Sequence, residues 1–301
     1  MFRLLSKESN IFSIPIYIGF LLLVVIIFNL LNFNTYEAII AGITFLGVAL
    51  GYFCFNSLNL NYQTHLPLFL YTFFIFGLYP GNMDIGLAVA LLNNSFLLLL
   101  LTSPDEEIRK RSYVLVGAII GLNFVFLPTT WPMAVFIIFH IVATSNRIAL
   151  NIFRFFFGVS LIAISYFSFA YFMGYTTWNP DYLPLVDLKI VKDISELIPL
   201  IPVALMVIFA VIDHFRNYNK KSPTSKFKYT FLLIYSLAQL ISIVLYMNTN
   251  YEYLMLLALP FTIILSRTIK FLPKTWMREA SIWVIIICLC LYKVGTYVPI
   301  F

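Results

Sequence analysis

The chain is patterned as long apolar runs separated by short polar breaks. The runs are continuous and do not alternate with a period of two, so they predict helices and not the strands of a membrane barrel. Several are close to the roughly 20 residues that cross a bilayer. The sequence therefore predicts an all-α fold: a polytopic transmembrane helical bundle of about eleven spans, in which 1–301 is a single transmembrane domain with no separate soluble domain. The expected spans are 14–33, 37–56, 66–79, 85–102, 113–127, 132–145, 149–174, 195–215, 230–248, 253–267 and 280–296.

Composition supports lipid as the solvent for most of the chain. Hydrophobic residues make up 61% and charged residues 11%, whereas a soluble domain carries about 25% charged residues. No water-soluble fold could hide so much apolar surface. Three of the runs are short, so each could either cross the bilayer fully or re-enter on the side from which it started. They are 66–79, 132–145 and 253–267.

The distribution of basic residues predicts the orientation, because cytoplasmic loops of membrane proteins carry excess Lys and Arg. With the N-terminus in the cytoplasm and the C-terminus in the periplasm, sixteen of the nineteen Lys and Arg residues fall on the cytoplasmic side. The three outer ones are Lys189, Lys192 and Lys293. The net charge of +6 is thus a topology signal, and no nucleic-acid partner is expected. The abundance of Asn, Ile, Lys, Phe and Tyr is typical of an AT-rich genome and favours a bacterial inner (cytoplasmic) membrane.

Motifs of soluble enzymes are missing from the sequence. It has no glycine-rich phosphate loop, no zinc-ligand spacing and no serine elbow, so neither a metal nor a cofactor is expected. We interpret Lys293 as a side chain that snorkels from the last span to the outer surface. Neutral polar residues inside the spans are expected to hydrogen-bond across helices as structural contacts; they are Asn93, Asn94, Ser95, Asn123 and Gln239.

Polar and aromatic residues gather in the short turns predicted on the outer side. If these turns surround a groove, they could position a lipid-linked substrate and supply a carboxylate as general base. The candidate catalytic acids are Glu37 and Asp84, and the candidate substrate-binding residues are Thr129, Thr130, Trp131 and Asp181. The alternative interpretation is ordinary turn chemistry with an aromatic belt at the membrane surface.

The region 55–175 resembles two known groups of membrane proteins. It has a GxxxGL helix at 115–122, an outer proline turn at Pro128, a short helix, a basic cytoplasmic turn with Arg147 and Arg154, and a long helix. This order resembles the middle of the C-type glycosyltransferases, which use polyprenyl-phosphate sugars. With the segment 59–80 it resembles an uncharacterised family of polytopic inner-membrane proteins from Bacteroidota. The C-type enzymes carry their catalytic acid on a long first outer loop; here that loop is short and Glu37 is the acid at the matching place.

The sequence thus favours a bacterial inner-membrane envelope protein that handles a lipid-linked, polyprenyl-phosphate substrate on the periplasmic side. Whether it is an enzyme stays open. Two alternatives remain: a non-enzymatic membrane subunit of a secretion, motility or polysaccharide-assembly complex, and a transporter or flippase. The expected partners are membrane lipids, with a lipid-linked substrate or other envelope membrane proteins as further candidates.

Overall fold

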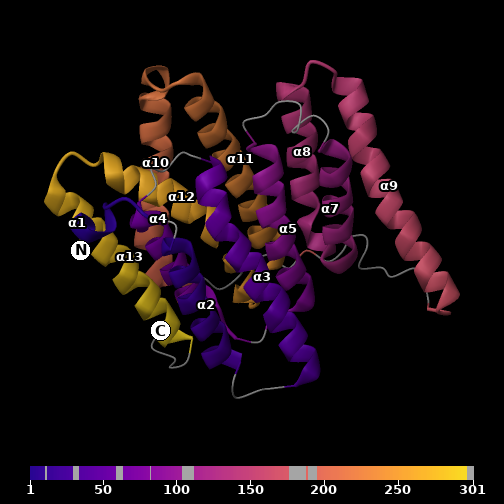
Figure 1. The fold of residues 1–301 in the computed structure, drawn as a ribbon, viewed down its shortest axis with the longest axis horizontal. Coiled ribbons are helices and arrows are strands. Elements are labelled where there is room, and N and C mark those ends of the chain that lie inside the picture. Colours follow the sequence, from indigo (N-terminus) through magenta and orange to yellow (C-terminus); the bar gives the residue numbers. More distant parts are fainter. Residues whose placement is uncertain are drawn as a thin grey trace.

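The computed structural model describes residues 1–10, 12–29, 34–58, 64–81, 83–103, 112–175, 188 and 195–296. In these residues the structure is a bundle of α-helices (Figure 1). The helices are α1 (Phe2–Leu5), α2 (Ser13–Asn29), α3 (Thr35–Leu58), α4 (His65–Leu78), α5 (Ile85–Leu101), α7 (Tyr113–Phe126), α8 (Trp131–Thr144), α9 (Ile148–Phe172), α10 (Ile201–Arg216), α11 (Pro223–Tyr246), α12 (Met255–Phe271) and α13 (Thr275–Gly295). Short 3-10 turns are η2 (Pro128–Thr130), η4 (Ser195–Leu200), η5 (Tyr218–Lys220) and η6 (Tyr251–Leu254).

The predicted all-α fold is confirmed, and each predicted span coincides with one helix from α2 to α13. Helix α11 begins at Pro223, well before the predicted start near 230, because Ser222 caps it and proline suits a first helical turn. In the described part of the chain, five helices are long and apolar enough to cross a bilayer, and they indicate a membrane protein. They are Thr35–Phe55, Ile148–Phe172, Ser195–Arg216, Pro223–Tyr246 and Tyr251–Phe271.

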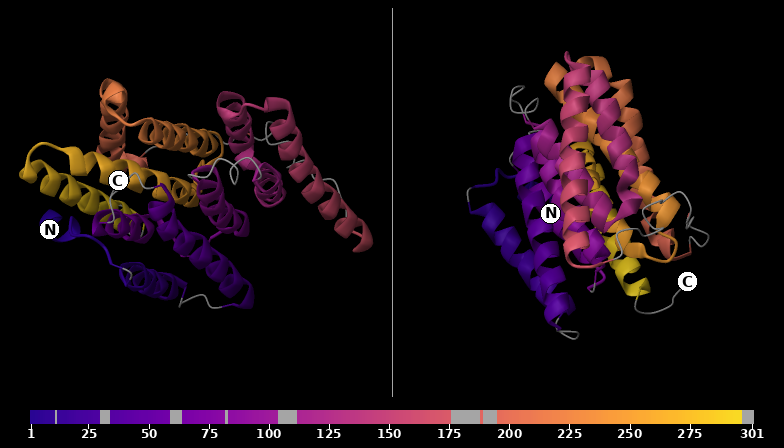
Figure 2. Two further views of the ribbon diagram at one scale, coloured as in Figure 1. Left: turned by 45° about the horizontal axis from the view of Figure 1, so that its top comes forward. Right: turned by 90° about the vertical axis from the view of Figure 1, so that its right-hand side faces the viewer.

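The helices pack in two connected series. Helices α3, α5, α7 and α9 follow one another, each packed on the next, so α9 lies at one edge of the bundle (Figures 1 and 2). A second series runs from α8 through α11 and α12 to α4. Helices α10 and α13 pack against α12, and α2 packs against α3 and α4.

Close helix contacts depend on glycine. A Cβ added to Gly117 of α7 would lie 2.0 Å from the carbonyl oxygen of Phe155 in α9, and one added to Gly158 would lie 2.0 Å from that of Val114. Gly117 and Gly121 are the glycines of the GxxxGL segment, which therefore brings two membrane helices into backbone contact. Gly47 of α3 meets the backbone of α5 in the same way.

Buried polar side chains connect the same helices, as the sequence predicts for most of them. Asn93 of α5 donates from Nδ2 to Asn123 Oδ1 of α7 at 2.6 Å. Ser95 Oγ donates to the carbonyl oxygen of Gly47 at 2.9 Å. Asn94 Nδ2, in contrast, is buried without a hydrogen-bond partner among the described residues. These bonds fix the positions of α3, α5 and α7 relative to one another.

Contacts between helix ends divide the bundle into two sides, which we call outer and inner after the predicted orientation. On the inner side the N-terminal amine contacts Glu279 Oε1 at 3.0 Å, and Arg267 Nη2 donates to Ser225 Oγ at 2.8 Å. On the outer side Asn29 Nδ2 donates to Tyr79 Oη at 2.6 Å. Every one of these pairs joins ends that the eleven-span topology places on the same side. Which side faces the cytoplasm stays a prediction from the charges.

Candidate functional site

A set of hydrogen bonds, which we call the outer-rim network, connects three turns on the outer side. The backbone N–H of Asp84 donates to Glu252 Oε2 at 2.8 Å. The next residue, Tyr253, shares a hydrogen bond of 3.0 Å with the Thr129 hydroxyl. Trp131 Nε1 then donates to Tyr246 Oη at 2.7 Å. The network therefore joins the start of α5, the turn before α8 and the α11–α12 connection.

Asp84 has a structural role in this network. It is the N-cap of α5, and its Oδ1 accepts a 2.7 Å hydrogen bond from the Gly86 N–H. An aspartate here satisfies one of the free N–H groups of the first helical turn and suits the positive end of the helix dipole. One carboxylate oxygen is thus engaged by the helix.

Glu37 and Asp84 line one small pocket, which we call the carboxylate pocket. It has a volume of about 180 Å³ and lies between α2, α3 and the start of α5; its other lining residues are Asn29, Tyr36, Ile40, Met83 and Ile85. Glu37 Oε2 is buried and has no hydrogen-bond partner among the described residues. A buried, unpartnered carboxylate oxygen is costly, and it can accept a proton or a hydrogen bond from a group that enters the pocket.

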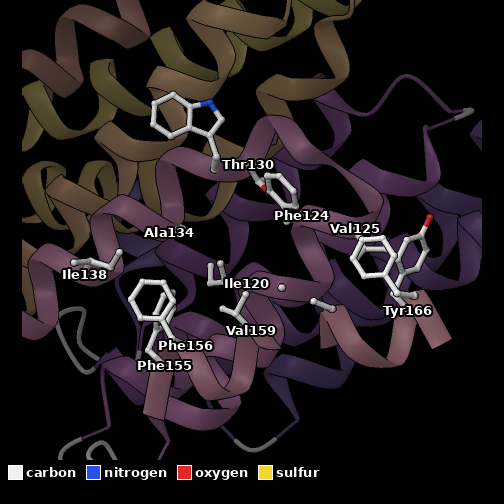
Figure 3. A pocket seen from close by; sticks show the side chains of 14 residues that line it. Ile120, Phe124, Val125, Thr130, Ala134, Ile138, Phe155, Phe156, Val159 and Tyr166 are labelled. Carbon is white, nitrogen blue, oxygen red and sulfur yellow. The ribbon is translucent and has the colours of Figure 1, made fainter. Parts of the chain in front are cut away.

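An apolar groove of about 440 Å³ lies between α7, α8 and α9. Figure 3 shows rings of Phe124, Phe156 and Tyr166 around it, contributed by α7 and α9. Phe156 and Phe167 are about half exposed, so the groove opens toward the surroundings of the bundle. Thr130 and Trp131 line its outer end, and Trp131 belongs to the outer-rim network as well.

The structure therefore brings together most of the residues selected from the sequence. Glu37 and Asp84 share the carboxylate pocket, Thr129 and Trp131 belong to the outer-rim network, and Thr130 lines the groove. Asp181 lies outside the described residues. The catalytic and binding roles of these residues stay predictions.

The interpretation of Lys293 as a snorkelling side chain is wrong. Lys293 is 7% exposed; its ammonium donates to the carbonyl oxygen of Tyr79 and lies 4.0 Å from the centroid of the Phe28 ring. The carbonyl and the ring face replace solvent for the charge, so α13 can keep this lysine inside the bundle. The cation is engaged in joining α13 to α2 and α4.

Four further residues of the site escaped the sequence interpretation. Asn29 and Tyr36 line the carboxylate pocket, and Tyr246 and Tyr253 bond to Trp131 and Thr129. Tyr253 directly follows the outer acid Glu252, which is the one local signal that could have identified it. The others become part of the site only through packing between helices far apart in the sequence.

Comparison with known proteins identifies the family of the chain. The family model described as a family of unknown function (DUF6427) matches residues 1–298, nearly the whole chain. This agrees with the resemblance to an uncharacterised family. No curated protein and no solved structure matches the chain.

Proposed function

The chain belongs to the DUF6427 family, whose function is unknown, and we propose from its geometry that it handles a lipid-linked molecule of the bacterial envelope. The chain of the molecule lies in the groove between α7, α8 and α9. Its head group lies over the outer-rim network, on the periplasmic side of the inner membrane. The expected consequence is a membrane protein that takes its ligand from the bilayer and not from water.

One observation carries this proposal: the apolar groove ends at Trp131, which also belongs to the outer-rim network. Thr130 lines the same outer end of the groove. From Trp131 the rim continues through Thr129 and Tyr253 to Glu252 and Asp84. An amphiphile needs this combination, an apolar wall that ends in a small number of placed polar groups.

The carboxylate pocket indicates which part of a head group it can take. Two carboxylates, Glu37 and Asp84, line the pocket, and the nearby Lys293 is engaged by Tyr79 and Phe28. A phosphate would be repelled by the two acids, so the pocket suits the hydroxyl-bearing part. Glu37, whose Oε2 has no partner among the described residues, is the better general base for such a hydroxyl, because Asp84 is engaged in capping α5.

Blocking the groove tests the proposal directly. Ala163 of α9 lines the groove, whereas its neighbour Ile164 is 64% exposed and does not line it. We expect Ala163→Trp to lose a lipid that copurifies with the wild-type protein and Ile164→Trp to retain it, as measured by mass spectrometry of lipid extracts. Wild-type protein that carries only the bulk lipid composition, or retention of the specific lipid by Ala163→Trp, would overturn the proposal.

The acids are tested separately from lipid binding. The double variant Glu37→Gln with Asp84→Asn removes both charges and keeps the α5 cap, because asparagine caps as well as aspartate. We expect it to fold and bind lipid but to fail in complementing a deletion strain. Full complementation would remove the catalytic role of the acids and leave the lipid-binding proposal in place.

A second candidate is a non-enzymatic subunit of an envelope complex. The observation that favours it is the exposure of α9. Only 17% of the residues in its most apolar stretch are buried inside the bundle, and Phe153, Ile164 and Phe172 are strongly exposed. Lipid chains also satisfy such a face, so this candidate ranks second. Charged substitution at Phe153 would release a stoichiometric membrane partner if the face is an interface, and copurification from native membranes measures this.

A further inference from the structure

A group of basic and aromatic side chains on the inner side, which we call the inner cation cluster, lies at the ends of α10, α11 and α12. Lys226 Nζ lies 4.9 Å from the ring centroid of Tyr218. Arg267 and Lys221 lie 4.9 Å and 5.2 Å from that of Tyr229. Each cation therefore rests on an aromatic face, an arrangement that holds a long basic side chain in place without neutralising it.

His214 fixes the geometry of this cluster. It is fully buried and its ring lies 4.3 Å from that of Tyr229. Lys221 Nζ lies 3.0 Å from His214 Nδ1, and His214 Nε2 lies 3.2 Å from Thr230 Oγ1. Because an ammonium is a donor only, Nδ1 accepts and Nε2–H donates to Thr230. The neighbouring Asp213 accepts at Oδ1 from Asn217 Nδ2 at 2.8 Å.

The cluster has an excess of positive charge. Within the described residues, neither Lys221 nor Lys226 has a carboxylate at salt-bridge distance. Burial, and next the positive charge of Arg267, lower the pKa of Lys221 below its ordinary value, although Asp213 acts in the opposite direction. A bound anion would relieve this repulsion between like charges.

An apolar pocket of about 450 Å³, the inner pocket, adjoins the cluster between α8 and α11. Phe139, Phe231 and Ile234 are among its apolar lining residues, and Lys226 and Tyr218 line it as well. Thr230 belongs to both features, because it lines the pocket and bonds to His214. The pocket opens toward the surroundings of the bundle, since Phe139 is 68% exposed. A cation beside an apolar pocket at a membrane surface is complementary to a phospholipid, with its phosphate on the cation and its acyl chain in the pocket.

We propose that the inner pocket and the inner cation cluster form a specific site for an anionic phospholipid, with the lipid phosphate at Lys226 and an acyl chain between α8 and α11. This site is distinct from the groove, since the two share no lining residue and the groove lies between α8, α7 and α9 whereas the inner pocket lies between α8 and α11. Anionic lipids are a component of the cytoplasmic leaflet. The bound lipid would hold the inner ends of α8 and α11 together.

The test uses the purified full-length protein and two lipids that differ in net charge, phosphatidylglycerol and phosphatidylcholine, in a native mass spectrometry titration. We expect one equivalent of phosphatidylglycerol to bind about tenfold more tightly than phosphatidylcholine. Lys226→Gln should weaken phosphatidylglycerol binding about fivefold. Lys220→Gln, an exposed lysine of the same loop that does not line the pocket, should change binding less than about twofold.

Three outcomes would overturn the proposal. An equal loss of phosphatidylglycerol affinity in Lys226→Gln and Lys220→Gln would show a diffuse attraction by surface charge and not a site. Displacement of the lipid by inorganic phosphate at millimolar concentration would assign the cluster to a free anion. Equal binding of the two lipids would remove the role of charge. A further variant, Ala143→Trp, fills the inner pocket without changing any charge and should weaken phosphatidylglycerol binding. Unchanged binding by this variant would overturn the proposal as well, and the variant decides the case if Lys226→Gln does not fold.

Discussion

The contact between α7 and α9 gives the sharpest test of the packing, because both helices contribute a glycine to it. A methyl group added at Gly117 or at Gly158 would lie 2.0 Å from a carbonyl oxygen of the facing helix. Cβ atoms essentially never approach another heavy atom closer than 3.0 Å. Alanine at either position must therefore separate the backbones by at least about 1.0 Å, since the obstructing atom is backbone and cannot rotate away.

The cost follows from this displacement. A gap of 0.5 to 1 Å removes about a quarter to a half of the dispersion energy of each contact along the interface. Overpacking of a close-packed interior costs about 1–3 kcal/mol, and alanine recovers about 1 kcal/mol of this through its higher helix propensity. We therefore expect Gly117→Ala and Gly158→Ala each to lower the free energy of unfolding by a net amount of about 1–2 kcal/mol.

The assay is reversible unfolding in mixed micelles, followed by circular dichroism. Gly42→Ala in α3 is the matched control, because an added Cβ there has nothing within 4 Å; this variant should be as stable as the wild type or slightly more stable. The double variant of Gly117 and Gly158 should lose clearly less than the sum of the single losses, since one separation of the helices relieves both clashes.

Two results would refute this reasoning. If the free energies of unfolding of Gly117→Ala and Gly158→Ala both lie within about 0.5 kcal/mol of the wild-type value, α7 and α9 do not approach as closely as described. Strict additivity of the two losses would mean that the glycines do not act at one shared interface.

Three further pairs of substitutions test the polar contacts in the same unfolding assay. Asp84→Ala should lose about 1 kcal/mol through the α5 cap, whereas Asp84→Asn should lose almost nothing; equal losses would exclude capping. Asn93→Leu should cost about 1–2 kcal/mol because it leaves a buried Asn123 oxygen unpaired, and adding Asn123→Leu should recover part of that loss; a double variant less stable than the single one would contradict this. Trp131→Phe should cost about 1 kcal/mol through the hydrogen bond to Tyr246, and Tyr246→Phe should add little to it; full additivity would mean that the two side chains do not interact.

The course of the helices could be predicted because lipid imposes one requirement on every span. Each span has to be apolar and must satisfy its own backbone hydrogen bonds, so hydrophobic runs mark the helices almost directly. The GxxxGL segment of α7 makes a close helix contact, since only small residues permit one. The surface that Gly117 meets, however, is the backbone of Phe155 in α9, which no local pattern identifies.

The site was less accessible from the sequence. Glu37 and Asp84 could be selected because acids are rare here and both occur at predicted outer ends. Their shared pocket depends on the packing of α3 against α5, which sequence separation does not reveal. Lys293 was misinterpreted because solvent is the default partner of a lysine near a helix end, whereas here a carbonyl and the Phe28 ring take that place.

Helix α9 is attached to the bundle along one face, mainly by α7 and in addition by α8. Detaching it would expose little beyond that interface, so the free energy of its local opening is the free energy of one contact and not that of the whole fold. In hydrogen-exchange terms α9 would form an opening unit of its own, with the backbone contacts at Gly117 and at Gly158 setting its protection. Because α9 is also a wall of the groove, any molecule that fills the groove and touches both walls would slow exchange in α9 before it changed exchange elsewhere.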